Sequence, residues 1–181
     1  MPMSSPLVPD FQELAATHLE SAYNLARWLV RDPALADDVV QDAMLRALRY
    51  YHGFRGENAR AWLLQIVRNV ALTRLKRSGA EPAASETDLD SISQTAEVGH
   101  DGPETALIRQ DDQRLLHELL AGLPVELREC LILREIEELS YKEIAQLTNV
   151  PIGTVMSRIA RARTMLAELL LSRDEGRRAQ S

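Results

Sequence analysis

The sequence predicts an all-α protein with two small helical domains joined by a flexible acidic linker. Alanine, leucine, arginine and glutamate recur at helical spacing over long stretches, which is the pattern of amphipathic helices. Aromatic residues make up only 4% of the chain, and no segment has the alternating pattern typical of a strand. With 181 residues, 45% of them hydrophobic, the chain has enough apolar side chains for one modest core or two small ones.

Three helices are expected in the N-terminal half. Asp10 and Glu13 have the spacing of a capping box, so the first helix is expected to begin there. Asp32 and Pro33 suit the start of the second, since aspartate accepts hydrogen bonds from exposed amides and proline already has a helical φ. A short loop at 53–58 precedes the third helix. The expected spans are residues 10–30, 32–51 and 59–77.

Between residues 78 and 102 the composition changes to Ser, Ala, Thr, Glu and Asp, with few large apolar side chains. We interpret this stretch as the linker, so the two domains are expected at 10–77 and 103–172. The polar tail after Ser172 is expected to fray. The helices of the second domain are expected at residues 103–121, 124–138, 140–147 and 151–171.

The formal net charge of −6 is unusual for the class of nucleic-acid-binding proteins, because clustered Lys and Arg supply most of the non-specific affinity for phosphates. The charge is unevenly distributed, however. Acidic residues dominate the linker, whereas Glu57 is the only acidic residue between positions 55 and 77. The basic residues of that segment are Arg55, Arg60, Arg68, Arg74, Lys76 and Arg77.

Several classes of protein are disfavoured by what the sequence lacks. The single Cys130 excludes an internal disulfide, and the four histidines are scattered without metal-ligand spacing, so we expect no metal or cofactor. No grouping of residues has catalytic spacing, so an enzyme is not expected. The N-terminus does not resemble a secretion signal, and no apolar run approaches the roughly 20 residues needed to cross a bilayer. We therefore expect a cytoplasmic protein without membrane insertion.

The segment 140–163 predicts a helix-turn-helix. Ser140 and Glu143 form a capping box that starts its first helix. Residues 148–150 make a short turn, and Pro151 begins the second helix with a pre-set φ. A motif of this kind places its second helix in the major groove of duplex DNA.

The second helix of this motif sorts its side chains by face. Val155, Ile159, Ala162 and Leu166 fall on one inward stripe at 100° per residue. Arg161 is the best candidate to contact a base, because its guanidinium matches guanine O6 and N7. The alternative is a surface helix with solvated arginines. The capped first helix and the three-residue turn argue against this alternative. The candidate duplex-binding residues are Met156, Ser157, Ala160 and Arg161, with Arg158 and Arg163 at the borders toward the phosphates.

A second nucleic-acid-like surface is expected on the third helix. The inward stripe of this helix is formed by Trp62, Leu63, Ile66, Val67 and Val70. Amide and basic side chains are therefore left on its outward face. Such a face can hold the phosphates of a single strand, and the preceding loop can receive an unstacked base. An ordinary amphipathic helix with a solvated basic side remains the alternative. The candidate residues are Phe54, Arg55, Gly56, Glu57, Asn58, Gln65, Arg68 and Asn69.

The second helix carries an acidic cluster in its first turns, formed by Asp37, Asp38, Gln41 and Asp42. Acids near a helix N-terminus interact favourably with its dipole, which is a sufficient local reason for some of them. A basic partner protein is the competing explanation. Spacing alone does not decide between the two.

Three segments in this order resemble the extracytoplasmic-function sigma factors, a compact group of bacterial RNA polymerase sigma subunits. The resemblance covers nearly the whole chain and implies sigma region 2 at 10–77 and sigma region 4 at 103–172. It implies an alternative sigma factor that binds core RNA polymerase and directs promoter-specific initiation. The segments are DDVVQDAMLRAL, FRGENARAWLLQIVRNVALTRLKR and SYKEIAQLTNVPIGTVMSRIARAR.

The resemblance also implies roles for particular residues. Asp38, Gln41 and Asp42 match positions that bind the β′ clamp helices of core polymerase, and region 4 is expected to meet the β flap. Asn69 and the loop at 54–58 match positions that capture the melted non-template strand of the −10 element. Met156, Ser157, Ala160 and Arg161 match positions that face the −35 duplex. An anti-sigma factor is an expected partner.

Two departures from the family pattern limit what can be transferred. Met156 stands where many relatives have a basic residue, so the −35 preference of those relatives cannot be copied. Asp42 replaces a more usual glutamate. A free-standing helix-turn-helix regulator, which binds duplex DNA as a symmetric dimer without polymerase, is the alternative function.

Overall fold

The computed structural model describes residues 10–56, 58–78 and 114–178, and within these ranges all regular structure is helical. This confirms the all-α class. The N-terminal bundle consists of α1 (Phe11–Val30), α2 (Pro33–Tyr50), the short 3-10 helix η1 (Tyr51–Gly53) and α3 (Ala59–Arg77). The C-terminal bundle consists of a helical segment at 114–121, α5 (Val125–Glu135), α6 (Tyr141–Thr148) and α7 (Ile152–Arg178). Most of the predicted linker and the predicted helical residues 103–113 lie outside the described residues.

The helices of the N-terminal bundle begin and end at residues that the local chemistry favours. Asp32 caps α2 as predicted, because its Oδ1 accepts hydrogen bonds from the backbone nitrogens of Ala34 at 2.9 Å and Leu35 at 3.3 Å. At Asp10, by contrast, the predicted capping box is wrong. The Asp10 side chain makes no cap hydrogen bond, and only its carbonyl accepts from the Leu14 amide at 3.0 Å.

Small and branched apolar side chains fill the space between α1, α2 and α3. The three helices pack against one another in all pairs, and their contacting faces are fully buried. Alanines on each helix allow the backbones to approach closely. The most deeply buried residues include Ala22, Leu25, Ala26 and Leu29 of α1, Ala36, Val39 and Ala43 of α2, and Leu63, Leu64 and Val67 of α3.

Two boundaries of the C-terminal bundle differ from the prediction. Helix α5 ends at Glu135 rather than near Glu138, because Glu138 adopts a positive φ of 52°, which an α-helix does not accommodate. Helix α7 continues to Arg178, so residues 173–178 are helical where a frayed tail was expected, and residues 179–181 lie outside the described residues. An ion pair between Arg173 and Glu118 ties this extension to the helical segment at 114–121.

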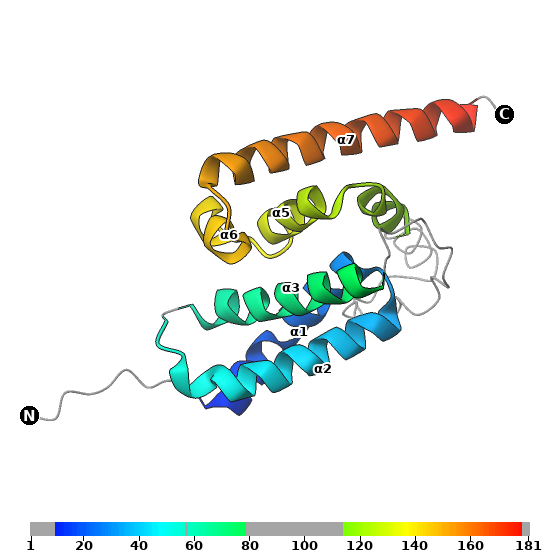
Figure 1. Ribbon diagram of the computed structural model, residues 1–181. Coiled ribbons are helices and arrows are strands. Elements are labelled where there is room, and N and C mark those ends of the chain that lie inside the picture. Colours follow the sequence, from blue (N-terminus) through cyan, green and yellow to red (C-terminus); the bar gives the residue numbers. More distant parts are fainter. Residues whose placement is uncertain (1–9, 57, 79–113, 179–181) are drawn as a thin grey trace, which may run out of the picture.

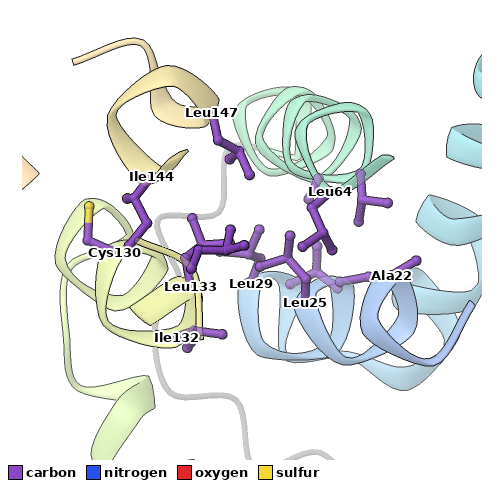
Figure 2. Close-up of a cluster of buried hydrophobic side chains, with 14 of the residues drawn as sticks. Ala22, Leu25, Leu29, Leu64, Cys130, Ile132, Leu133, Ile144 and Leu147 are labelled. Carbon is purple, nitrogen blue, oxygen red and sulfur yellow. The ribbon is translucent and has the colours of Figure 1, made fainter. Parts of the chain in front are cut away.

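The two bundles lie against each other (Figure 1), and their buried apolar residues form one continuous hydrophobic core. Helix α5 contacts α1, and α6 contacts α3. At this junction, Leu25 and Leu29 of α1 lie close to Leu133 of α5, and Leu147 of α6 points toward Leu64 of α3 (Figure 2). The sequence predicted two small domains, but it did not predict that their apolar faces are buried against each other. In the described part of the chain, no helix is long and apolar enough to span a membrane.

Candidate nucleic-acid interfaces

The helix-turn-helix begins with a complete capping box. The Ser140 amide donates to Glu143 Oε2 at 2.8 Å, and the Glu143 amide donates to Ser140 Oγ at 3.2 Å. The carboxylate of Glu143 accepts hydrogen bonds from the Ser140 amide and, at 2.7 Å, from the Ser140 hydroxyl, and these two bonds hold its pKa below the usual value. The prediction of a defined helix start at Ser140 is confirmed.

The turn between α6 and α7 is set by Asn149. Its φ of 57° lies in the left-handed region, where asparagine is tolerated better than most residues. Its amide donates to the Ala145 carbonyl, which also accepts from the Val150 amide at 3.1 Å. The Pro151 carbonyl then accepts from Thr154 and Val155 and starts α7. The three-residue turn therefore fixes the direction in which α7 leaves.

One face of α7 is buried and the opposite face is open. Val155, Ile159 and Ala162 are fully buried, as predicted, and Leu166 is half-buried against the same core. Helix α7 lies on the outer side of the C-terminal bundle, with α5 and α6 between it and the N-terminal bundle (Figure 1). The exposed positions are Met156, which is 51% exposed, and Ser157, Ala160 and Arg161.

The two border arginines of α7 differ in their surroundings. Arg163 is exposed and forms an ion pair with Glu135 of α5, which raises the pKa of its guanidinium. Arg158 is turned inward, with Nη1 3.7 Å from Oε1 of the buried Glu129 and only 23% of its side chain exposed. The side chain of Arg158 therefore does not extend freely toward a flanking phosphate in this arrangement.

The candidate strand-binding face of α3 lies partly under the C-terminal bundle. Arg68, predicted to face outward, is only 16% exposed, and its Nε donates to Glu129 Oε2 at 2.7 Å. Asn58 caps α3 by accepting from the Ala61 amide at 2.9 Å, and its Nδ2 donates to Glu143 Oε1 at 2.6 Å. Gln65 is half-buried, whereas Asn69 is exposed.

The loop before α3 is held by an aromatic contact. The ring of Phe54 lies against that of Trp62, with centroids 4.8 Å apart. A Cβ atom at Gly56 would come within 3.0 Å of Phe54 Cε2, so the small residue permits the loop to fold over this ring. Arg55 is exposed, and Glu57 lies outside the described residues.

Helix α2 presents a mixed acidic and apolar surface. Asp38 and Gln41 are exposed, while Asp42 forms ion pairs with Arg46 at 3.3 Å and Arg74 at 3.7 Å. Leu45 and Leu48, one and two turns after Gln41 on the same side, are 58% and 49% exposed. The sequence prediction assigned no site role to these leucines, although their helical spacing from Gln41 signals a shared face.

Sequence reasoning also missed two acidic residues that organise the junction. Glu129 and Glu137 are almost completely buried in the C-terminal bundle, and they bind Arg68 and Arg60 of α3. Neither has a local signal, because each contact joins residues more than 60 positions apart.

These features define a two-part helical protein, with a helix-turn-helix in one bundle and an exposed acidic and apolar helix in the other. Two family models match it, sigma-70 region 2 at residues 14–81 and sigma-70 region 4 at residues 113–166. The chain belongs to the sigma-70 family, in the extracytoplasmic-function group, and is an alternative sigma factor that directs transcription initiation.

Relatives and solved structures agree with this assignment. The RNA polymerase sigma-H factor of Pseudomonas aeruginosa is 37% identical over 147 residues, which cover 78% of this chain and 76% of that protein. The extracytoplasmic-function sigma-E factor of Escherichia coli K12 is 36% identical over 133 residues, 70% and 69% of the two chains. Both relatives are RNA polymerase sigma factors, so neither they nor the family models favour the free-standing regulator.

Two solved structures resemble the whole described fold. The Bartonella quintana sigma factor RpoE, solved with the anti-sigma factor NepR, has a TM-score of 0.72 and 28% identity, covering 89% of this chain and 96% of that one. CnrH, solved with the cytosolic domain of CnrY, has a TM-score of 0.61 and 26% identity, covering 90% and 88%. Both bundles of this chain therefore have counterparts in sigma factors.

Proposed function

We propose that this sigma factor binds core RNA polymerase through α2 and recognises its promoter through α7 and α3. The observation that carries the proposal is the separation of two open surfaces. Helices α7 and α2 lie on opposite sides of the molecule (Figure 1), and each has an exposed face. A subunit that joins DNA to a larger enzyme needs two such independent surfaces.

The α2 surface fits a protein partner better than a nucleic acid. Asp38 and Gln41 are exposed beside Leu45 and Leu48, so the face combines negative charge with apolar area. Negative charge repels phosphates and attracts a basic protein surface. We assign Asp38, Gln41 and Asp42 to the contact with the β′ clamp helices, and a further contact of the C-terminal bundle to the β flap.

The DNA-directed residues divide between duplex and single strand. The exposed residues Met156, Ser157, Ala160 and Arg161 suit the major groove of the −35 element, with Arg158 and Arg163 near its phosphates. Asn69, Gln65 and Arg68 of α3, with the loop residues Phe54, Arg55, Gly56, Glu57 and Asn58, suit the melted −10 strand. Capture of the open strand offsets the free energy of unpairing.

An anti-sigma factor is the partner that we propose for regulation, by analogy with the sigma factor RpoE solved with the anti-sigma factor NepR. The catalysis belongs to polymerase, so this chain itself needs no catalytic site. Its place of action is the cytoplasm, where promoter DNA and polymerase meet.

Reconstituted transcription tests the proposal. Core polymerase freed of sigma subunits is incubated with this chain and a promoter library, and run-off products are sequenced. We expect defined start sites only when both proteins are present. A gel shift with and without core polymerase is the companion measurement. Tight binding to a palindromic duplex by the chain alone, with no start-site selection, would overturn the proposal in favour of a free-standing regulator.

A further inference from the structure

The first two turns of α7 expose two large apolar side chains to water. Ile152 is 45% exposed and Met156 is 51% exposed. Because they are four residues apart in a helix, the two side chains are neighbours on one side of it. A single exposed apolar side chain needs no explanation, but a neighbouring pair leaves a larger apolar area in water. The pair therefore indicates a partner that presents an apolar group.

This end of α7 is open on its outer side. Gly153 lies between the two residues, and a Cβ atom placed on it would meet no neighbouring atom of the described chain within 4 Å. Helix α7 lies on the outside of the C-terminal bundle (Figure 1). In a helix-turn-helix, the N-terminal residues of the second helix are the ones that contact base edges. Ile152 and Met156 therefore lie where a base pair can reach them, beside the exposed Ser157.

Polar groups that could read a base are scarce in the same two turns. Residues 152–157 include no charged side chain. The Ser157 hydroxyl donates to the Thr154 carbonyl at 3.0 Å, so its proton is used within the helix. The next residue, Arg158, is directed toward the buried Glu129, and only 23% of its side chain is exposed. Apolar contact is therefore the main means by which the start of α7 can distinguish base pairs.

Only one base presents an apolar group in the major groove. Thymine carries its 5-methyl group there, whereas guanine, adenine and cytosine present hydrogen-bond donors and acceptors. Contact with apolar side chains removes this methyl group from water, which is favourable. Complete burial of one such carbon strengthens binding about fourfold. An exposed isoleucine and methionine thus match thymine better than any other base.

We propose that Ile152 and Met156 form a contact site for the 5-methyl group of a thymine in the −35 duplex. This inference rests on the proposed function, because it requires α7 to enter the major groove of that duplex. It goes further by naming the chemical group that is recognised and by adding Ile152 to the residues that recognise it. Arg161 follows Met156 by more than one helical turn, so the thymine and the guanine that they contact belong to different base pairs.

The test removes the methyl group from the DNA and leaves the protein unchanged. A promoter is first selected from a library with core polymerase and the full-length chain. Each thymine of its −35 element, on either strand, is then replaced in turn by deoxyuridine, which pairs with adenine in the same way but has no methyl group. The intact and substituted promoters compete for limiting holoenzyme. Run-off products of different lengths give the ratio of initiation at the two promoters.

We expect one thymine at which deoxyuridine lowers the share of transcripts about fourfold. Met156→Ala should abolish this difference and Ile152→Ala should reduce it, whereas Met156→Leu keeps an apolar side chain and should preserve it. Leu171→Ala is the matched control, because Leu171 is an apolar residue of the same helix, 64% exposed and outside the proposed DNA face. The control should give the wild-type ratio.

Several outcomes would overturn the proposal. One is a selected −35 element that contains no thymine on either strand, and another is a wild type that tolerates every deoxyuridine. A methyl effect that persists undiminished in the Met156→Ala chain is the third, because it would originate in the DNA or elsewhere on the protein. The first two do not depend on whether a variant folds. Accurate initiation without any methyl effect would remove this inference alone, whereas a wild type that directs no transcription would remove the proposed function as well.

Discussion

Trp28 of α1 stacks on His117 of the C-terminal bundle, with ring centroids 4.1 Å apart and planes 16° from parallel. Burial disfavours the imidazolium form and, with repulsion from Arg27, lowers the pKa of His117 to about 4 from an ordinary 6.5. Between these values the unfolded chain binds a proton that the folded chain does not. The free energy of unfolding therefore falls as the pH drops from 6.5 toward 4.

The first prediction follows from this stack. His117→Phe keeps an aromatic ring against Trp28 and removes the titration, so it should flatten the loss of stability in acid. We expect the wild type to lose on the order of 1 kcal/mol more than the variant at pH 5, allowing for solvent screening at a half-exposed ring. Urea unfolding at pH 8 and pH 5 measures this, and equal losses in the two proteins would contradict the assignment.

The second prediction concerns recognition of the −35 element. Arg161 is exposed on the open face of α7, where its guanidinium can pair with guanine. Arg161→Ala should reduce discrimination between promoters by about 1 to 3 kcal/mol in competitive run-off assays. Arg161→Lys keeps the charge and loses the paired donors, so it should retain general DNA affinity but not the preference. An unchanged preference in both variants would remove Arg161 from base recognition.

The third prediction separates promoter opening from polymerase binding. Asn69 is exposed on α3. Among the described residues, its side chain accepts a hydrogen bond from Arg68 and forms none with the C-terminal bundle. Asn69→Ala should leave assembly with core polymerase intact and lower the permanganate reactivity of melted thymines. Thr73→Ala is the control, because among the described residues the Thr73 hydroxyl donates only to the Asn69 carbonyl one turn earlier. Normal reactivity in the Asn69 variant would exclude this role.

The fourth prediction concerns the α2 surface. Asp38 is exposed and has no ion pair with any residue that the structure describes, whereas Asp42 is tied to Arg46 and Arg74. Asp38→Arg thus tests the interface without disturbing the N-terminal bundle, and it should weaken binding to core polymerase roughly tenfold or more. Glu20→Arg makes the same charge change on the exposed side of α1 and should have no effect. Equal co-purification of both variants with core polymerase would exclude Asp38 from the contact.

Much of the helical organisation could be predicted because it depends on neighbours in the chain. The caps at Asp32 and Ser140 involve amides two or three residues away. The buried stripe of α7 follows from its 3.6-residue period, which places Val155, Ile159 and Ala162 on one face. The capping box predicted at Asp10 also depends on neighbouring residues, but it does not form. The spacing permits a cap without requiring the Asp10 side chain to turn toward the amides.

The sequence by itself determined the class of fold, the helix-turn-helix and the exposed face of α7, because each arises from short-range hydrogen bonds and from helical periodicity. Only the tertiary structure decided which charges are available. The partners of Arg68, Arg60 and Asn58 lie 61, 77 and 85 positions away in another bundle. A basic residue on an amphipathic helix has the same local pattern whether water, DNA or a buried glutamate faces it, so its partner depends on how the two bundles pack together.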